Sequence, residues 1–316
     1  MPSNTEPRSA THYVAPIEET PLQAVDQVNV DEKTRSLWTD AWESMRRRPT
    51  FWVSAVLILL ILVVAIVPGL FTHVDPRAAN LDYSDEGARA GHPLGYTRQG
   101  SDVFARVIWG AQNSLLVGLL ATVLVTIVGV VIGAIAGFYG GWLDAVVSRI
   151  ADIFFSIPTV LGAIVIMSVI PQRNAITVSL VLAVFAWPQI ARIMRGAVLS
   201  AKQSDYVTAS AALGVSRFQT LVKHVIPNSL APVIVVATVS LGTFIVAEAT
   251  LSFLGIGLPP SALSWGLDIG TARSSIRTNP STIFWPSAAL SITVLAFLLL
   301  GDVVRDALDP KARARR

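Results

Sequence analysis

The sequence predicts an all-α membrane protein with six transmembrane helices. Its 316 residues are 53% hydrophobic and only 14% charged, whereas soluble globular chains are nearer a quarter charged. Several apolar runs are close to the roughly 20 residues that a helix needs to cross a bilayer, and polar segments separate them. We expect spans near Phe51–Leu70, Ser114–Phe138, Val146–Ile170, Ile176–Met194, Ser229–Leu254 and Ile283–Leu300.

The basic residues predict how these spans are oriented. Arg46, Arg47 and Arg48 directly precede the first span, and most of the chain's 24 lysines and arginines fall on the same side of the predicted membrane. Short cytoplasmic segments carry such an excess of positive charge. The basic end Lys311–Arg316 fits the same side, beside anionic lipid. We therefore expect both termini to be cytoplasmic, which requires an even number of spans.

The segments before the first span predict a tail followed by a surface helix. Residues 1–35 are polar without an apolar period, which is typical of disorder. They lack the basic start and apolar core of a signal peptide. One apolar face then follows, suited to the lipid interface, and it consists of Leu37, Trp38, Trp42 and Met45.

Two spans contain residues that shape helix packing. Gly129, Gly133 and Gly137 lie four apart in the second span, on one helical face that another helix can approach closely. Packing is the ordinary interpretation, and a substrate groove is the alternative. In the third span, Pro158 predicts a kink.

Glu248 is an acid within the otherwise apolar fifth span. At 1.5 Å of rise per residue, it lies near the outer end of that span rather than at mid-membrane. Such an acid should face protein or water. The sequence leaves two roles open, either pairing with a loop residue or a position on the substrate path.

The polar segment Asp205–Asn228 predicts a compact element between two spans. An Ala-rich helical pattern covers Tyr206–Leu213, and Gly214 interrupts it. Ser216 can cap a second helix that runs to His224. Pro227 should end that helix before the next span. The alternative is an ordinary amphipathic connector.

Several chemistries find no support in the sequence. No Gly-x-x-x-x-Gly-Lys-Ser/Thr loop is present, so we predict that the chain does not hydrolyse ATP and is not itself an enzyme. There is no cysteine, and the four histidines lack ligand spacing, so no metal site is expected. No catalytic triad stands out, and no nucleic-acid partner is expected. Energy for uphill transport should come from a partner.

The segment around Gly214 resembles the EAA loop of ABC-importer permeases, whose pattern is Glu-Ala-Ala, three residues, Gly, nine residues, then Ile-x-Leu-Pro. Gly214 and Pro227 match that pattern. Thr208, Ser210 and His224 depart from it. The resemblance implies that the loop contacts the ATPase subunit, with contact residues Tyr206, Thr208, Ala209, Ser210, Gly214, His224 and Pro227.

Two further segments resemble the DppC/OppC-type permeases of dipeptide, oligopeptide and nickel ABC importers. The first is the end of the predicted external loop Phe71–Gln112, from His92 onward, where the matching residues include Gly95, Gly100, Asp102 and Arg106. The second runs from Glu248, near the end of the fifth span, to Gly266 and matches the family pattern almost letter for letter, with Glu248, Ser252, Phe253, Gly255, Gly257 and Trp265. The ending Gly301–Pro310 also matches the family pattern.

This resemblance implies a type I ABC importer permease fold. It divides the chain into a cytoplasmic tail (1–35), an OppC-like segment with the first span and external loop (36–110), the transmembrane domain with the coupling loop (111–302, loop 205–228) and a cytoplasmic tail (303–316). It implies four kinds of partner: a second, DppB/OppB-like permease, two ABC ATPases that bind ATP and Mg, an extracytoplasmic solute-binding protein, and the lipid bilayer of the cytoplasmic membrane.

The implied cargo is a di- or oligopeptide. Related permeases carry glutathione or nickel complexes, and the sequence does not separate these. A stand-alone secondary transporter is the alternative from another class. It predicts a charged site at mid-membrane and an inverted internal repeat, and the sequence shows neither.

Overall fold

The computed structural model describes residues 37–308, and the regular secondary structure in that range is helical, with only isolated β-bridges in place of strands. The predicted disordered tail 1–35 and the basic end Lys311–Arg316 lie outside the described residues. The elements are α2 (Leu37–Arg46), α3 (Pro49–Ile66), η1 (Pro68–Leu70), η2 (Leu81–Tyr83), α4 (Val103–Tyr139), α5 (Gly141–Ser156), α6 (Thr159–Val169), α7 (Ala175–Ala201), α8 (Asp205–Ala212), α9 (Arg217–Thr220), η3 (Leu221–Val225), α10 (Ile226–Phe253), α11 (Trp265–Ala272), η4 (Arg273–Ser275) and α12 (Ser281–Leu308).

The helices confirm the predicted all-α membrane class. Within the described range, five helical segments are long and apolar enough to cross a membrane, and the pair α5 and α6 forms a sixth if it is one broken span. The predicted kink at Pro158 in the third span is confirmed, because the chain bends by 84° between α5 and α6. Pro158 is the physical cause. It lacks an N–H group and forces Ile157 into an extended conformation, with φ −98° and ψ 117°.

Several helix boundaries differ from the predicted spans, and the largest differences are in α4 and α12. The polar loop that was expected to reach Gln112 ends at Asp102, where α4 begins. The Asp102 carboxylate accepts a 2.5 Å hydrogen bond from the Ala105 N–H and so caps the helix. At the other end of the chain, α12 continues past the expected Leu300 to Leu308. Hydropathy locates the part of a helix that is apolar, and both helices extend beyond it.

The glycine face of α4 is a packing surface, as its spacing predicts. A Cβ atom on Gly129 would lie 2.6 Å from Cβ of Ile190, and one on Gly137 would lie 2.9 Å from the Arg195 carbonyl oxygen. A Cβ atom on Gly133 would overlap the carbonyl of Ala191. All three partners are on α7, so α4 and α7 pack backbone to backbone at the centre of the molecule.

Gly133→Ala is therefore expected to destabilise the protein. The added methyl group meets a backbone carbonyl, which cannot move aside as a side chain can, and such overpacking costs about 1–3 kcal/mol. Gly196→Ala on α7 is the matched control, because a Cβ there meets no heavy atom within 4 Å. Thermal unfolding of the detergent-purified protein measures both. Equal melting temperatures for the two variants would contradict this packing.

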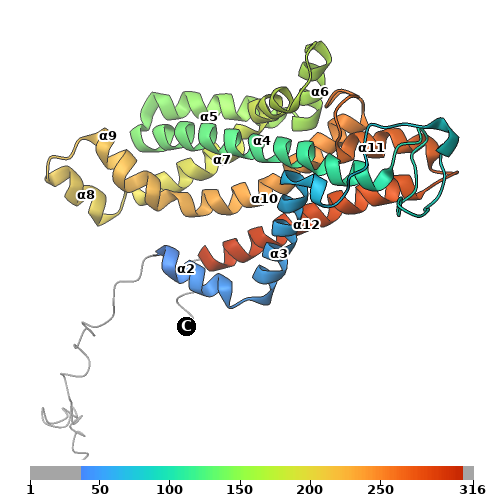
Figure 1. Ribbon diagram of the computed structural model, residues 1–316. Coiled ribbons are helices and arrows are strands. Elements are labelled where there is room, and N and C mark those ends of the chain that lie inside the picture. Colours follow the sequence, from blue (N-terminus) through green and yellow to red (C-terminus); the bar gives the residue numbers. More distant parts are fainter. Residues whose placement is uncertain (1–36, 309–316) are drawn as a thin grey trace, which may run out of the picture. The chain divides into compact units, whose positions relative to one another are not determined.

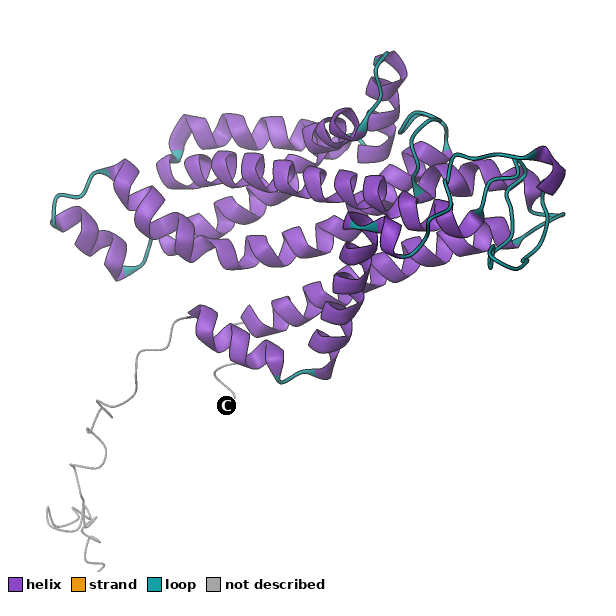
Figure 2. Ribbon diagram, in the orientation of Figure 1, coloured by secondary structure: helices purple, strands orange, loops and turns teal. Residues whose placement is uncertain are grey.

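The long helices carry polar structure at their two ends. Figure 1 shows α8 and α9 at one end of α10, and α11 with the loop 71–102 at the opposite end. Most of the non-helical chain gathers at this second end (Figure 2). Between the ends, buried apolar side chains of α4, α7 and α10 form the main hydrophobic core. We call the two ends the tip (Ser204–Val225) and the α11 end.

Candidate functional site

The tip is a helix, a glycine break and a second helix, as the sequence predicts. Gly214 has φ +78°, a left-handed conformation that favours glycine. The N–H groups of Gly214 and Val215 donate to the carbonyls of Ala211 and Ser210, which closes the end of α8. Ser216 then caps α9, because its Oγ accepts from the Gln219 N–H at 3.3 Å.

Buried contacts fix the two short helices of the tip against each other. The hydroxyls of Ser210 and Thr220 are hydrogen-bonded at 3.1 Å, and both residues are buried. Val207 and Leu221 belong to the main core cluster. Ser210 was expected at an ATPase contact, but its side chain faces inward and joins α8 to α9.

The surface of the tip exposes large apolar side chains. Leu213 is 83% exposed and Phe218 is 67% exposed, while the predicted contact residue Tyr206 is 39% exposed. Sequence reasoning missed Leu213 and Phe218. Their signal was present, because each is a large apolar residue within a few positions of the glycine break in an otherwise polar segment. The other predicted contact residues are also on the surface, namely Thr208, Ala209, Gly214, His224 and Pro227.

The predicted helix end at Pro227 is wrong. The chain passes from α9 through the π-helical turn η3 into α10 without a break, and Pro227 lies in the first turn of α10. The wider π turn accounts for this, since it carries the hydrogen-bond ladder past the point where proline lacks an N–H group. The tip is thus a direct extension of the helix that contains Glu248.

Contacts with the end of α4 hold the tip in place. Two residues before the tip, Lys202 Nζ donates a 2.7 Å hydrogen bond to the carbonyl of Phe138. The guanidinium of Arg217 lies 5.5 Å from the centre of the Tyr139 ring, within the range of a cation–π contact. The tip therefore has a defined position against the bundle rather than the freedom of a simple connector.

At the α11 end, a buried polar cluster surrounds Glu248. This carboxyl is completely buried, and Oε1 accepts a 2.7 Å hydrogen bond from Ser252 Oγ. Ser252 Oγ also accepts from the Leu258 N–H at 3.2 Å, which brings the loop after α10 back onto the helix. Hydroxyls of Ser114 and Ser264 complete the surroundings of the acid. Of the two predicted roles, this geometry matches pairing with loop residues.

Trp265 anchors the same cluster to α4. Its backbone N–H donates to Ser114 Oγ at 3.2 Å, and its Nε1–H donates to the carbonyl of Val107 at 2.9 Å. A Cβ on Gly266 would lie 2.5 Å from Cα of Ala249, so α11 packs directly on the α10 backbone. The predicted motif residues Glu248, Ser252 and Trp265 therefore converge on one site.

Three other motif residues shape the surrounding chain. Gly255 has φ +75° and ends α10 in the left-handed conformation. Gly257 approaches Ser252 so closely that a Cβ would lie 2.5 Å from the serine backbone nitrogen. Phe253 is half-buried, and the guanidinium of Arg273 lies 6.0 Å from its ring centre.

The predicted residues that precede α4 shape the loop 71–102, and Asn279 joins this loop to the α11 end. Gly95 and Gly100 have φ +75° and +73°, and each passes close to another loop backbone. The Asp102 carboxylate accepts a hydrogen bond from the Ala105 N–H at the start of α4, and it also lies 2.7 Å from Nδ1 of His92. Asn279 donates to the carbonyls of loop residues, including Tyr96 at 3.4 Å.

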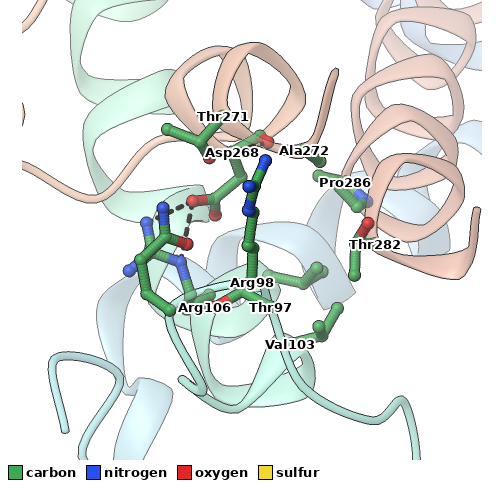
Figure 3. Close-up of a pocket in the computed structure, with 11 residues that line it drawn as sticks. Thr97, Arg98, Val103, Arg106, Asp268, Thr271, Ala272, Thr282 and Pro286 are labelled. Carbon is green, nitrogen blue, oxygen red and sulfur yellow. Dashed lines mark hydrogen bonds and ion pairs between the residues drawn. The ribbon is translucent and has the colours of Figure 1, made fainter. Parts of the chain in front are cut away.

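Arg106 pairs with a partner that sequence reasoning missed. Its Nε donates to Oδ1 of Asp268 at 2.8 Å, and Nη2 contacts the same oxygen (Figure 3). Asp268 is buried in α11, and burial raises the pKa of its carboxyl above the usual value although Arg106 opposes the shift. Figure 3 also shows Arg98 of the loop beside this pair. The sequence did contain a signal for this partner, because Asp268 is an acid in the first turn of the helix that begins after Ser264.

Comparison with known proteins identifies the class of this membrane protein. The family model "Binding-protein-dependent transport system inner membrane component" matches residues 129–314, which is more than half of the chain. A second model, "N-terminal TM domain of oligopeptide transport permease C", matches residues 36–90. The chain belongs to the family of binding-protein-dependent inner membrane components, the permease subunits of ABC importers, and is a multi-pass protein of the cytoplasmic membrane.

Named relatives agree with this assignment over nearly the whole chain. The chain is 36% identical over 290 residues to the oligopeptide transport system permease protein OppC of Bacillus subtilis (strain 168), covering 92% of this chain and 95% of that protein. It is likewise 36% identical over 293 residues to the glutathione transport system permease protein GsiD of Escherichia coli O157:H7, covering 92% and 96%.

Proposed function

We propose that this chain is the peptide-conducting permease subunit of an ABC importer. It works beside a second, DppB/OppB-like permease, with two ATPases and an extracytoplasmic solute-binding protein. The chain itself is non-catalytic, and ATP and Mg are bound by the ATPases. The observation that carries the proposal is the tip, a helical element held against the bundle, on which the large apolar side chains of Leu213 and Phe218 are exposed.

Such exposed apolar groups fit a protein partner. Around them the tip is polar, and Arg217 and Lys223 add positive charge. An apolar centre with a polar rim is the usual composition of a protein–protein contact. We assign this contact to the ATPase and place the tip in the cytoplasm together with both termini. Because the tip continues through η3 into α10, a movement of the ATPase can reach the membrane through one continuous helix.

The proposed cargo is a short peptide. The relatives are named for oligopeptide and glutathione transport, and glutathione is itself a tripeptide. One cargo chemistry, an extended chain with amide groups and a free carboxylate, therefore covers both names. A nickel complex is the alternative within the family.

Uptake into proteoliposomes tests this function. The chain is reconstituted with its cognate permease, ATPases and binding protein, and radiolabelled tripeptides, pentapeptides, glutathione and a nickel–histidine complex are offered in turn. The proposal predicts ATP-dependent accumulation of a peptide that unlabelled peptides compete away. Accumulation of nickel alone would overturn the peptide assignment. Uptake by this chain alone, without ATPases, would favour a secondary transporter.

A further inference from the structure

The buried acid Glu248 has no role in the proposed contact with the ATPase, which lies at the other end of α10. The side chain is fully enclosed by α4, α10 and the segment that leads into α11. The polar groups around its carboxyl are the hydroxyls of Ser114, Ser252 and Ser264. These three residues come from three different parts of the chain, so the acid lies where those parts meet.

Arginines of the neighbouring helices form ion pairs with acids other than Glu248. Within residues 37–308, arginines of these and adjoining helices form ion pairs with other acids: Arg106 with Asp268, Arg195 with Asp144 and Arg48 with Asp306. Within the described residues, the Glu248 carboxyl lies beside serine hydroxyls and takes part in no ion pair, and its Oε2 has no hydrogen-bond partner. A carboxylate anion enclosed in this way, without a cation, is strongly disfavoured inside a protein.

A protonated carboxyl suits the same surroundings. Oε1 accepts from Ser252, as observed. A proton on Oε2 would make that oxygen a donor, and the hydroxyls of Ser114 and Ser264 can accept a hydrogen bond. Both of these serines already hold the start of α11: Ser114 Oγ accepts from the Trp265 N–H, and Ser264 Oγ accepts from the Leu267 N–H at 3.2 Å.

We propose that Glu248 is a positioning residue for transport, an uncharged acid that fixes α11 against α4 and α10. The inference rests on the proposed function only in taking uptake as the activity affected. The connection from Leu254 to Ser264 lacks a regular helix, so the start of α11 is held by contacts with α4 and α10, and this cluster supplies several of them. Asn113 adds one further link, because its Nδ2 donates to the Leu263 carbonyl at 2.8 Å.

The geometry also explains why the cluster matters for function. It lies at the α11 end, opposite the tip, on the same helix that leads to the tip. If α11 keeps a fixed place on α10, then a binding event at the α11 end is transmitted along α10. If α11 is loose, the two ends are uncoupled even though the permease is assembled.

The test compares Glu248→Gln with Glu248→Ala in the complete reconstituted complex. Glutamine keeps the shape and both kinds of hydrogen bond without a charge, whereas alanine removes them. Thr250→Ala is the matched control, since its hydroxyl bonds only within α10, to the Val246 carbonyl. Complex assembly, basal ATPase activity, ATPase activity stimulated by the binding protein, and peptide uptake are measured for each variant.

We expect Glu248→Gln and Thr250→Ala to keep stimulated ATPase activity and uptake within about twofold of the wild type. Glu248→Ala should assemble and keep basal ATPase activity, but lose stimulation and uptake by about tenfold, a typical size for lost coupling between sites. Rescue by glutamine is the readout that separates an uncharged positioning acid from a charged group on the substrate path.

Two results would overturn the inference. One is an assembled Glu248→Ala complex with normal stimulation and uptake. The other is a Glu248→Gln complex as defective as the alanine variant, which would show that the charge is needed. If Glu248→Ala fails to assemble, Ser252→Ala takes its place, with a partial loss of stimulation expected and normal stimulation overturning the proposal. A wild-type complex without ATP-dependent peptide uptake would instead refute the proposed function.

Discussion

A complex whose chain carries Leu213→Ser and Phe218→Ser is expected to lose nearly all peptide uptake. These two side chains are the most exposed large apolar groups of the tip. Truncating a central apolar anchor of an interface costs about 2 kcal/mol or more, which is about thirtyfold in affinity. The ATPases should therefore dissociate from the permease during purification. Co-purification and uptake into proteoliposomes measure the two effects.

The matched control for this prediction is Leu81→Ser. Leu81 is 76% exposed and also apolar, but it is in η2, within the loop 71–102 at the opposite end of the molecule. The control should retain its ATPases. Retention of ATPases and of uptake by the double tip variant would show that the contact is elsewhere.

The second large effect is expected from Arg106→Ala, which should strongly destabilise the protein. Asp268 is buried and takes its hydrogen bonds from Arg106, so removal of the arginine leaves a buried acid without its cation. Breaking a buried pair in this way costs about 3–5 kcal/mol. The double variant Arg106→Ala with Asp268→Ala should be more stable than Arg106→Ala alone. Thermal unfolding of the purified complex provides the comparison.

The Arg106–Asp268 pair also predicts how the stability of the Arg106→Ala variant changes with pH. Burial raises the pKa of Asp268 above its unfolded value, and loss of Arg106 removes the influence that opposes this shift. A carboxyl with a raised pKa stabilises the fold below the unfolded value, about 3.9, and loses that contribution as the pH rises. The deficit of Arg106→Ala should therefore grow from acid to neutral pH. Arg277→Ala, an exposed arginine at the same end, should show no such trend.

Features that depend on neighbours in sequence were predictable. The spans follow from the length of apolar runs, the α4 packing face follows from the spacing of Gly129, Gly133 and Gly137, and the tip follows from Gly214 and Ser216. In each case the physical cause is local. A glycine in the left-handed conformation, or a serine at a helix start, acts within one helical turn.

Features that depend on distant packing were not predictable. Arg106 and Asp268 are 162 positions apart, and neither signals the other in the sequence. Pro158 indicated where the third span bends, but the 84° angle also depends on how α5 and α6 pack on α7. Pro227 indicated a helix end, and the π turn η3 kept the helix continuous instead. A proline in the sequence identifies a position where a helix can bend or end, and the surrounding structure determines whether it does.

The central claim, that the tip is the contact with the ATPase, is tested most directly by cross-linking. The chain contains no cysteine, so Phe218→Cys introduces a single reactive thiol on the tip, and Leu81→Cys introduces one at the α11 end. A thiol-reactive photo-cross-linker is attached to each in the assembled complex. The account predicts that Phe218→Cys cross-links to the ATPase subunit, with a yield that changes on ATP addition, and that Leu81→Cys does not. Cross-linking of Leu81→Cys to the ATPase, with none from Phe218→Cys, would contradict it.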